Sequence, residues 1–219
     1  MFIGHFALGF AAKKAAPAVS LGTLFLACQL ADLVWPTLVL LGLEIVEITP
    51  GATAVTPLTF VSYPYSHSLV ALLVWAAAAS GLYAVLHRAG TAAIAMVAAL
   101  VVSHWVLDVI THAPDMPLTP GGDTRLGLGL WYSLPGTLVV ETALFAAGVW
   151  LYTRATVARD RAGTWGLWSL VAFLAIIYAA NLFGPPPPSV QAIAGAGHAI
   201  WLLILWGYWL DRHRVPRIA

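Results

Sequence analysis

The sequence predicts an all-α protein, a polytopic bundle of six transmembrane helices preceded by a short N-terminal helix, in one integral membrane domain over residues 1–219. Composition is the first reason. Of the 219 residues, 61% are hydrophobic and 9% are charged, whereas a soluble domain is about 45–50% apolar and about 25% charged. The mean hydropathy is +0.88. The second reason is that the apolar residues form stretches of the ~20 residues that a helix needs to cross a bilayer.

This composition excludes several classes of protein. A soluble globule of this size needs many more polar residues to cover its surface, which argues against a soluble enzyme, a nucleic-acid-binding module and a disordered tail. The formal net charge of +1 provides no basic surface for a nucleic acid. The single cysteine, Cys28, excludes a disulfide framework and a multi-cysteine metal site.

Six apolar stretches are long enough to span a bilayer. They run over Pro17–Leu43, Ser68–Leu86, Thr91–Ile110, Leu134–Tyr152, Trp165–Phe183 and Ser189–Leu210. A shorter apolar stretch, Phe2–Ala12, precedes them and ends at Lys13 and Lys14, so its charges follow the apolar run, unlike those of a signal peptide. The expected partner of most of the surface is therefore the lipid bilayer.

Basic residues predict how these spans are oriented. Nine of the ten Lys and Arg residues lie at alternating ends of the six spans, and only Arg125 lies at the opposite ends. By the positive-inside rule, the nine face the cytoplasm, together with the C-terminus. The loops expected outside are Glu44–His67, Thr111–Ser133 and Gly184–Pro188, and the two longer ones are expected to be irregular caps because they are rich in Pro, Gly and Thr.

Ionisable residues inside the spans are the most informative feature. Each costs about 2.5–3.5 kcal/mol at the centre of a span, so such residues usually face the bundle interior and serve a function. Asp32 lies in the first span. His104 and Asp108 lie in the third span, four residues apart and hence on one helix face. His112 continues that face by one more turn.

Three further residues are expected at the same depth. Glu141 lies in the fourth span, about two turns from its outer end, and His67 lies at the outer start of the second span. His5 joins them if Phe2–Ala12 is a helix that folds back along the first span, because that places His5 within about two turns of Asp32. The whole set is therefore predicted in the outer half of the bundle.

Imidazoles and carboxylates gathered at one depth indicate a metal site. Buried carboxylates repel one another unless they take up protons or share a cation, and imidazole and carboxylate are the usual ligands of zinc and related ions. The predicted ligands are His5, Asp32, His67, His104, Asp108, Glu141 and His112. The set exceeds the needs of one tetrahedral ion, which favours two or three ions. Zinc is the preferred ion, and manganese is the alternative.

Each residue also has a purely structural interpretation. His104 and Asp108 could form a hydrogen-bonded pair between helices, and Asp32 could be a protonated acid. His67 could be the first residue of its helix, beside a capping serine. For His198 in the last span, which lies among small residues that favour close helix packing, a packing hydrogen bond is the favoured interpretation.

Four motifs resemble a known family. They are Gly4-His5-Phe6-Ala7-Leu8-Gly9, Ala31-Asp32, His67-Ser68-Leu69 and Ser103-His104-Trp105-Val106-Leu107-Asp108. This pattern, over roughly the first 145 residues, is similar to that of the bacterial membrane-bound metal-dependent hydrolases, also described as LexA-binding, inner-membrane-associated hydrolases. The resemblance implies a helical protein of the bacterial inner membrane with a metal site. More distantly, the H-x-x-x-D of His104 and Asp108 resembles a metal-binding motif of zinc-dependent phospholipase C.

The combined expectation is a metal-dependent hydrolase at the outer membrane face. A phospholipid or other amphipathic ester or phosphoester is the expected substrate, with Asp32 or Glu141 as the general base. Three alternatives stay open. The same cluster could serve a divalent-cation or proton transporter, the histidines could hold haem in an electron carrier, or the metal could only stabilise a non-catalytic scaffold.

Overall fold

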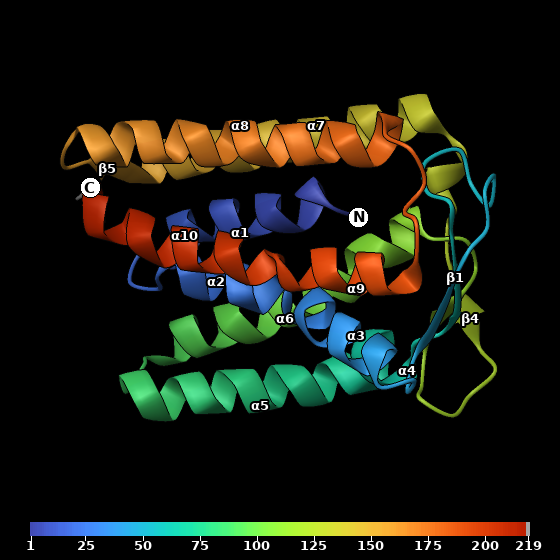
Figure 1. The fold of residues 1–219 in the computed structure, drawn as a ribbon. Coiled ribbons are helices and arrows are strands. Elements are labelled where there is room, and N and C mark those ends of the chain that lie inside the picture. The colour runs from blue at the N-terminus through green and yellow to red at the C-terminus, as the bar shows by residue number, and fades with distance from the viewer. Residues whose placement is uncertain (218–219) are drawn as a thin grey trace.

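A computed structural model describes residues 1–217 as a bundle of helices with short strands at both ends (Figure 1). Five helices are long and apolar enough to cross a membrane. They are α5 (Leu69–His87), α6 (Thr91–Thr111), α7 (Leu134–Ala155), α8 (Arg161–Phe183) and the consecutive α9 (Val190–His198) and α10 (Ile200–His213) taken as one. The predicted helical, membrane-compatible fold is thus confirmed, and each of these five coincides with a predicted span.

The remaining predicted span, Pro17–Leu43, is not one straight helix. It is divided into α2 (Leu21–Cys28) and α3 (Leu30–Leu40), which are bent by 53°. The break lies at Gln29, whose φ of −108° and ψ of 7° depart from helical values. Pro36 lies inside α3 and does not end it. The structure therefore has a bent pair of short helices in place of the sixth straight span.

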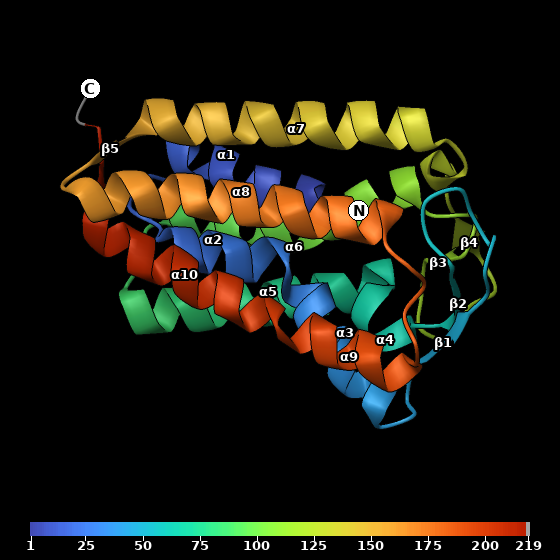
Figure 2. The ribbon, with the colours of Figure 1, turned by 45° about the horizontal axis from the view of Figure 1, so that its top comes forward.

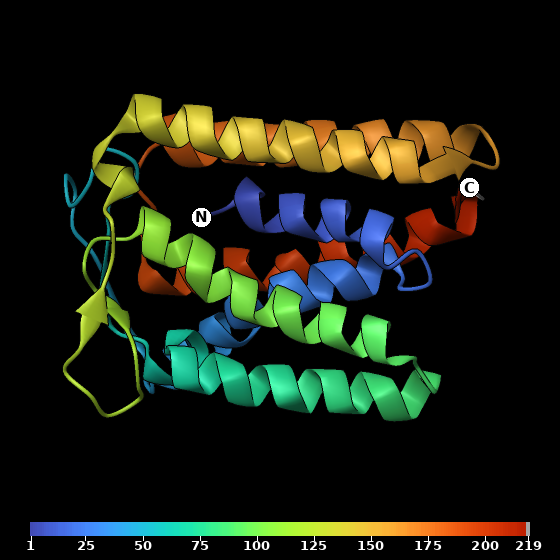
Figure 3. The same ribbon diagram turned by 180° about the vertical axis from the view of Figure 1, so that it is seen from behind.

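The short N-terminal helix α1 (Ile3–Ala15) forms the centre of the bundle. It packs against α2, α6, α7 and α8, and Figures 1 and 3 show it enclosed by these helices. Phe6 and Phe10 are fully buried and meet Phe25 of α2 edge to face. The chain then turns back into α2, as the fold-back prediction for His5 requires. Because other helices surround it, α1 is a core element that carries its residues into the interior.

Glycines allow the helices to approach closely at two contacts. A Cβ added to Gly148 of α7 would lie 2.3 Å from the carbonyl oxygen of Ala7 in α1. A Cβ added to Gly207 of α10 would lie 3.0 Å from the backbone of Gly22 in α2. Small residues of this kind are typical of membrane helix interfaces. They fix α1 against α7 and α2 against α10.

Helices α3 and α9 pack on each other at one side of the bundle, and Figure 2 shows them leaning away from α8. His198 of α9 contributes to this contact. Its Nδ1 donates to the carbonyl oxygen of Ala194 at 2.8 Å, so its Nε2 accepts from the hydroxyl of Thr37 at 3.0 Å. The predicted packing role of His198 is confirmed.

Two strand pairs gather at one end of the bundle, where irregular loops were expected (Figure 1). The antiparallel pairs are β1 (Ile45–Ile48) with β2 (Leu58–Ser62) and β3 (Met116–Pro117) with β4 (Arg125–Leu126), and the short 3-10 helix η1 (Leu130–Tyr132) follows them. The loops are more ordered than predicted because their backbone N–H and C=O groups pair with one another.

The opposite end carries most of the basic residues. The connections α1–α2, α5–α6 and α7–α8 and the end of α10 meet there (Figure 1), beside the paired strands β5 (Thr156–Ala158) and β6 (Arg214–Pro216). Lys13 Nζ donates to the carbonyl oxygen of Val19 at 2.7 Å and pairs with Asp211 at 3.2 Å. The predicted gathering of basic residues at one end is confirmed, and the side of the membrane that this end faces stays a prediction.

Candidate metal centre

Five of the seven predicted ligands lie together near the strand-bearing end of the bundle. They come from four helices, namely α1 (His5), α3 (Asp32), α4 (Pro64–His67, which ends at His67) and α6 (His104 and Asp108), and α2 contributes a backbone carbonyl that contacts His104. Their nitrogen and oxygen atoms form two groups within 4.8 Å, His5–His104–Asp108 and Asp32–His67–His104, which share His104. The chain thus gathers three imidazoles and two carboxylates from distant segments.

Asp108 lies at the centre of this cluster and is 2% exposed. Its Oδ1 lies 3.0 Å from His5 Nε2 and 2.6 Å from the amino group of Met1. Its Oδ2 lies 3.1 Å from His104 Nε2 and 3.8 Å from His67 Nε2. The i, i+4 spacing predicted the pairing of Asp108 with His104. The distances to His5, His67 and His104 place the carboxylate of Asp108 between three imidazole rings.

The break between α2 and α3 determines the tautomer of His104. In a continuous helix the carbonyl oxygen of Cys28 would accept from the N–H of Asp32. Here it accepts from His104 Nδ1 at 2.8 Å. Because a carbonyl only accepts, Nδ1 carries a proton, and in the neutral imidazole Nε2 then presents a lone pair. Nε2 is buried and has no hydrogen-bond partner among the described residues, although Asp108 Oδ2 lies 3.1 Å away.

A chain of hydrogen bonds through Ser66 orients His67. Ser66 Oγ lies 2.6 Å from Glu44 Oε2 and 2.6 Å from His67 Nδ1. Ser66 Oγ donates its single hydroxyl proton to Glu44 Oε2, so it accepts from His67 Nδ1–H. His67 Nε2 therefore presents a lone pair toward Asp32 Oδ1 at 3.5 Å.

Glu44 is itself held in place. It is 2% exposed, and its Oε1 accepts the backbone N–H groups of Tyr65 and Ser66, each at 2.8 Å. These are free donors in the first turn of α4, a helix that begins at Pro64. Glu44 thus fixes α4 and the tautomer of His67 together.

These hydrogen bonds direct the Nε2 atoms of two histidines toward two carboxylates, an arrangement that a bound cation would stabilise. His67 Nε2 and His104 Nε2 converge on the carboxylates of Asp32 and Asp108. The amino group of Met1 offsets part of the charge at Asp108 Oδ1, and with neutral imidazoles the remaining acceptors repel one another. Metal-binding histidines typically donate their other ring N–H to a backbone carbonyl, a carboxylate or water, as His104 does to the carbonyl of Cys28. Two imidazoles and two carboxylates are a donor set that fits zinc, and His5 extends the set toward a second ion.

Glu141 of α7 lies outside both groups. Its Oε2 accepts the backbone N–H of Phe2 at 2.9 Å and that of Gly4 at 3.3 Å. The carboxylate thus satisfies free donors at the N-terminus of α1, where negative charge is favourable. This contact gives the buried acid a structural role that the sequence analysis did not foresee, and its predicted roles as ligand and general base stay predictions.

His112 also lies outside both groups, in a cluster of its own. α6 ends at Thr111, so His112 turns toward the loops, where its Nδ1 lies 3.0 Å from Asp115 Oδ1. The hydroxyl of Tyr63 also donates to Asp115. Burial lowers the pKa of His112 and raises the pKa of Tyr63, which favours a neutral imidazole and a protonated phenol.

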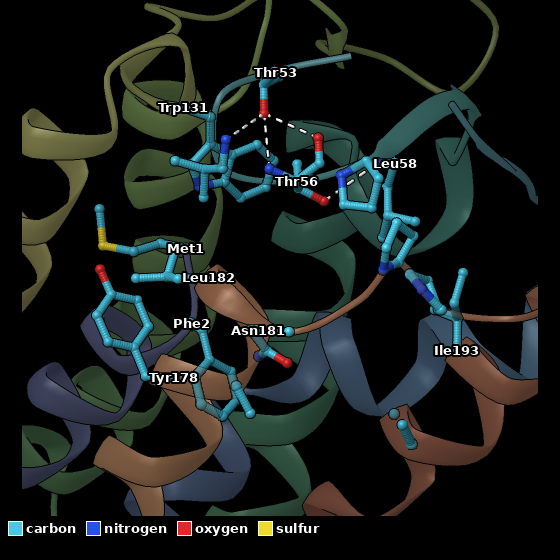
Figure 4. A pocket seen from close by; sticks show the side chains of 18 of the residues that line it. Met1, Phe2, Thr53, Thr56, Leu58, Trp131, Tyr178, Asn181, Leu182 and Ile193 are labelled. Carbon is cyan, nitrogen blue, oxygen red and sulfur yellow. Dashed lines mark hydrogen bonds between the residues drawn. The ribbon is translucent and has the colours of Figure 1, made fainter. Parts of the chain in front are cut away.

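A cavity of about 710 Å³ connects these clusters. Asp32, His67, Asp108, His112 and Glu141 all line it. Figure 4 shows Met1, Phe2 and Tyr178 on one side of it and Thr53, Thr56 and Trp131 on another. The side chain of Asp32 is 26% exposed and that of Asp108 is 3% exposed, so Asp32 is the carboxylate of the cluster that is more open to the cavity.

The sequence analysis missed the groups that orient the histidines. Glu44 and Ser66 fall in a loop, where no helical periodicity marks a buried face, and the carbonyl of Cys28 is freed only by the break at Gln29. The proline at the start of α4 is the one local sign of a short helix whose first turn needs an acceptor.

Comparisons with known proteins leave the family unassigned. No protein-family model matches the chain, and no similar curated protein or solved structure was found. The resemblance to membrane-bound metal-dependent hydrolases therefore stays a prediction that rests on the four motifs.

Proposed function

We propose that this protein is a membrane hydrolase that depends on a divalent metal ion and cleaves an ester or phosphoester. The observation that carries the proposal is the convergence of His67 Nε2 and His104 Nε2 on the carboxylates of Asp32 and Asp108 at the end of a cavity. Zinc is the proposed ion, and manganese is the alternative. When bound, such an ion polarises the substrate oxygen and acidifies a water molecule.

The residues of the cluster divide into two roles. His5, His67, His104 and Asp108 are nearly fully buried, which suits residues that hold an ion in a fixed geometry. Asp32, the most exposed of the cluster's carboxylates, is placed to accept the proton of an attacking water. Hydrolysis then adds the hydroxyl of water to the acyl or phosphoryl centre, and the proton goes to the departing oxygen.

The proposed location follows the basic residues. With the basic end of the bundle in the cytoplasm, the metal centre faces the outer leaflet and the C-terminus is cytoplasmic. The bacterial inner membrane is the proposed compartment, on the basis of the motif resemblance.

Ion transport is a second candidate function, and the break between α2 and α3 is the observation that favours it. Broken helices form ion sites in transporters, and the buried side-chain amide of Gln29 has no hydrogen-bond partner among the described residues. Phe6, Phe10 and Phe25 form a fully buried aromatic cluster within the adjoining core. We rank transport second because this structure closes the apolar core that an ion would have to pass.

The metal content of the protein purified in detergent tests the proposal. Elemental mass spectrometry should find bound zinc or manganese in the wild type, and His104→Gln and Asp108→Asn should lose it. His198→Gln is the matched control, since His198 lies outside the cluster and should leave the metal unchanged. Nitrophenyl carboxylic and phosphate esters then test hydrolysis. A folded wild type that takes up neither metal, or a loaded protein that cleaves neither ester, contradicts the proposal.

A further inference from the structure

The cavity at the metal centre has two chemically different ends. Asp32, His67 and Asp108 form its polar end. Ile177 and Leu182 of α8 and Ile193 and Ile200 of α9 and α10 form an apolar end. Its volume of about 710 Å³ lies within the roughly 300–1,000 Å³ of pockets that enclose small-molecule ligands. These two ends match a ligand that has a polar head group and an apolar chain.

The apolar end opens at the side of the bundle, between α8 and α9. Ala180 and Asn181 of α8 and Ala192 and Ala196 of α9 line the cavity and are exposed. Three of these four are alanines, so little side-chain volume fills the space between the two helices. Figure 4 shows Asn181 at the end of α8, with Ile193 on α9 across from it.

Helices α8 and α10 carry large exposed apolar side chains. Ile176 is 64% exposed, Phe183 is 67% exposed and Leu202 is 66% exposed. These residues belong to α8 and α10, both within candidate membrane spans. Exposed apolar side chains on these spans suit contact with the hydrocarbon of the bilayer.

The loop end of the cavity is covered. The connection between β1 and β2 lies over it, with Thr53 Oγ1 donating to the carbonyl oxygen of Thr56 at 3.0 Å (Figure 4). The N–H of Ala54 donates to the carbonyl oxygen of Trp131 at 3.1 Å, which ties this connection to the loop before α7. Hydrogen bonds thus hold the β1–β2 connection over this end of the cavity, while small exposed residues of α8 and α9 line its side.

We infer that the substrate is a lipid-like amphiphile drawn laterally from the bilayer, with its apolar chain between α8 and α9 and its ester-bearing head group at the metal centre. This inference rests on the proposed function, since it names the substrate class of the same site. The apolar walls hold the chain, and the polar end receives the head group.

Photolabelling in nanodiscs of phosphatidylcholine tests the route without requiring turnover. The probe is hexadecylphosphocholine with a diazirine in its chain. It should label Trp35, which lines the cavity and is 8% exposed, and also Val85, which is 78% exposed on the outer face of α5. Labelling of Val85 alone overturns the inference.

Two neighbouring substitutions distinguish blockage of the lateral route from a general effect on the fold. Ala180→Phe places a ring in the opening, whereas Ala179→Phe adds the same ring to an exposed residue that does not line the cavity. We expect Ala180→Phe to lose labelling at Trp35 relative to Val85, and Ala179→Phe to retain it. Equal retention or equal loss in both variants overturns the inference.

A metal-centre variant distinguishes this inference from the proposed function. His104→Gln should lose metal and hydrolysis and still label Trp35. Wild-type labelling of Trp35 without hydrolysis of any ester contradicts the proposed function alone. Hydrolysis of a soluble nitrophenyl ester, without labelling of Trp35, overturns the lateral route alone.

Discussion

Ser66 Oγ lies 2.6 Å from His67 Nδ1, and this contact decides which nitrogen of His67 faces the carboxylates. The hydroxyl has one proton, and the buried Glu44 takes it. His67 must then donate from Nδ1, which leaves Nε2 free as a ligand. A metal ligand is thus prepared by a carboxylate that lies outside the ligand set.

Glu44→Gln should reverse the direction of the hydrogen bonds that link residue 44, Ser66 and His67. The amide oxygen can still accept from the N–H groups of Tyr65 and Ser66, but the amide nitrogen then donates to Ser66 Oγ. Ser66 turns its proton toward His67 Nδ1, and the proton of His67 moves to Nε2. We expect metal affinity to fall by about 10–100-fold, as for other second-shell changes, in a competition titration with a chromophoric zinc chelator.

Glu47→Gln is the matched control for this titration, because Glu47 is exposed on β1. It should bind metal as the wild type does. Nitrogen chemical shifts of His67 should show the change of tautomer in Glu44→Gln. Unchanged affinity together with an unchanged tautomer would show that Glu44 only anchors α4.

Helical periodicity was sufficient to predict part of this site. The i, i+4 spacing placed His104 and Asp108 on one face, and the fold-back of the N-terminal helix placed His5 near them. The same reasoning extended the face to His112, but α6 ends at Thr111 and the chain turns away. The orienting contacts depend on a broken helix and a four-residue helix, whose tertiary partners leave no periodic signal in the sequence.

Glu141 separates a structural role from a ligand role. Glu141→Gln keeps an oxygen that can accept from Phe2 and Gly4, so we expect it to retain both fold and metal. Glu141→Ala leaves those buried donors unpaired, which costs about 1–3 kcal/mol for each unsatisfied group. Thermal unfolding in detergent and metal content should be measured on both variants. Loss of metal from a stable Glu141→Gln protein would instead support the predicted ligand role.

Gly148→Ala tests the close packing of α7 against α1, the helix that carries His5. The new Cβ would lie 2.3 Å from the carbonyl oxygen of Ala7, so the helices must separate, at a cost of about 1–3 kcal/mol. Gly81→Ala on α5 is the control, because no atom lies within 4 Å of its added Cβ and alanine favours a helix by about 0.5–1 kcal/mol. The midpoint temperature of thermal unfolding should therefore fall in Gly148→Ala and rise in Gly81→Ala. A shift of the same sign and size in both variants would contradict the close α1–α7 contact.

Metal removal should destabilise the fold, because the cluster joins α1, α3, α4 and α6. Binding to the folded state alone stabilises it by RT ln(1 + [metal]/Kd), about 2.7 kcal/mol at 100 times Kd. Unfolding in detergent should therefore occur at lower temperature with EDTA and at rising temperature as zinc is added. His104→Gln should respond to neither treatment, whereas His198→Gln should respond as the wild type does. Because free zinc also binds unfolded histidines, a response that persists in His104→Gln would place the bound ion elsewhere in the chain.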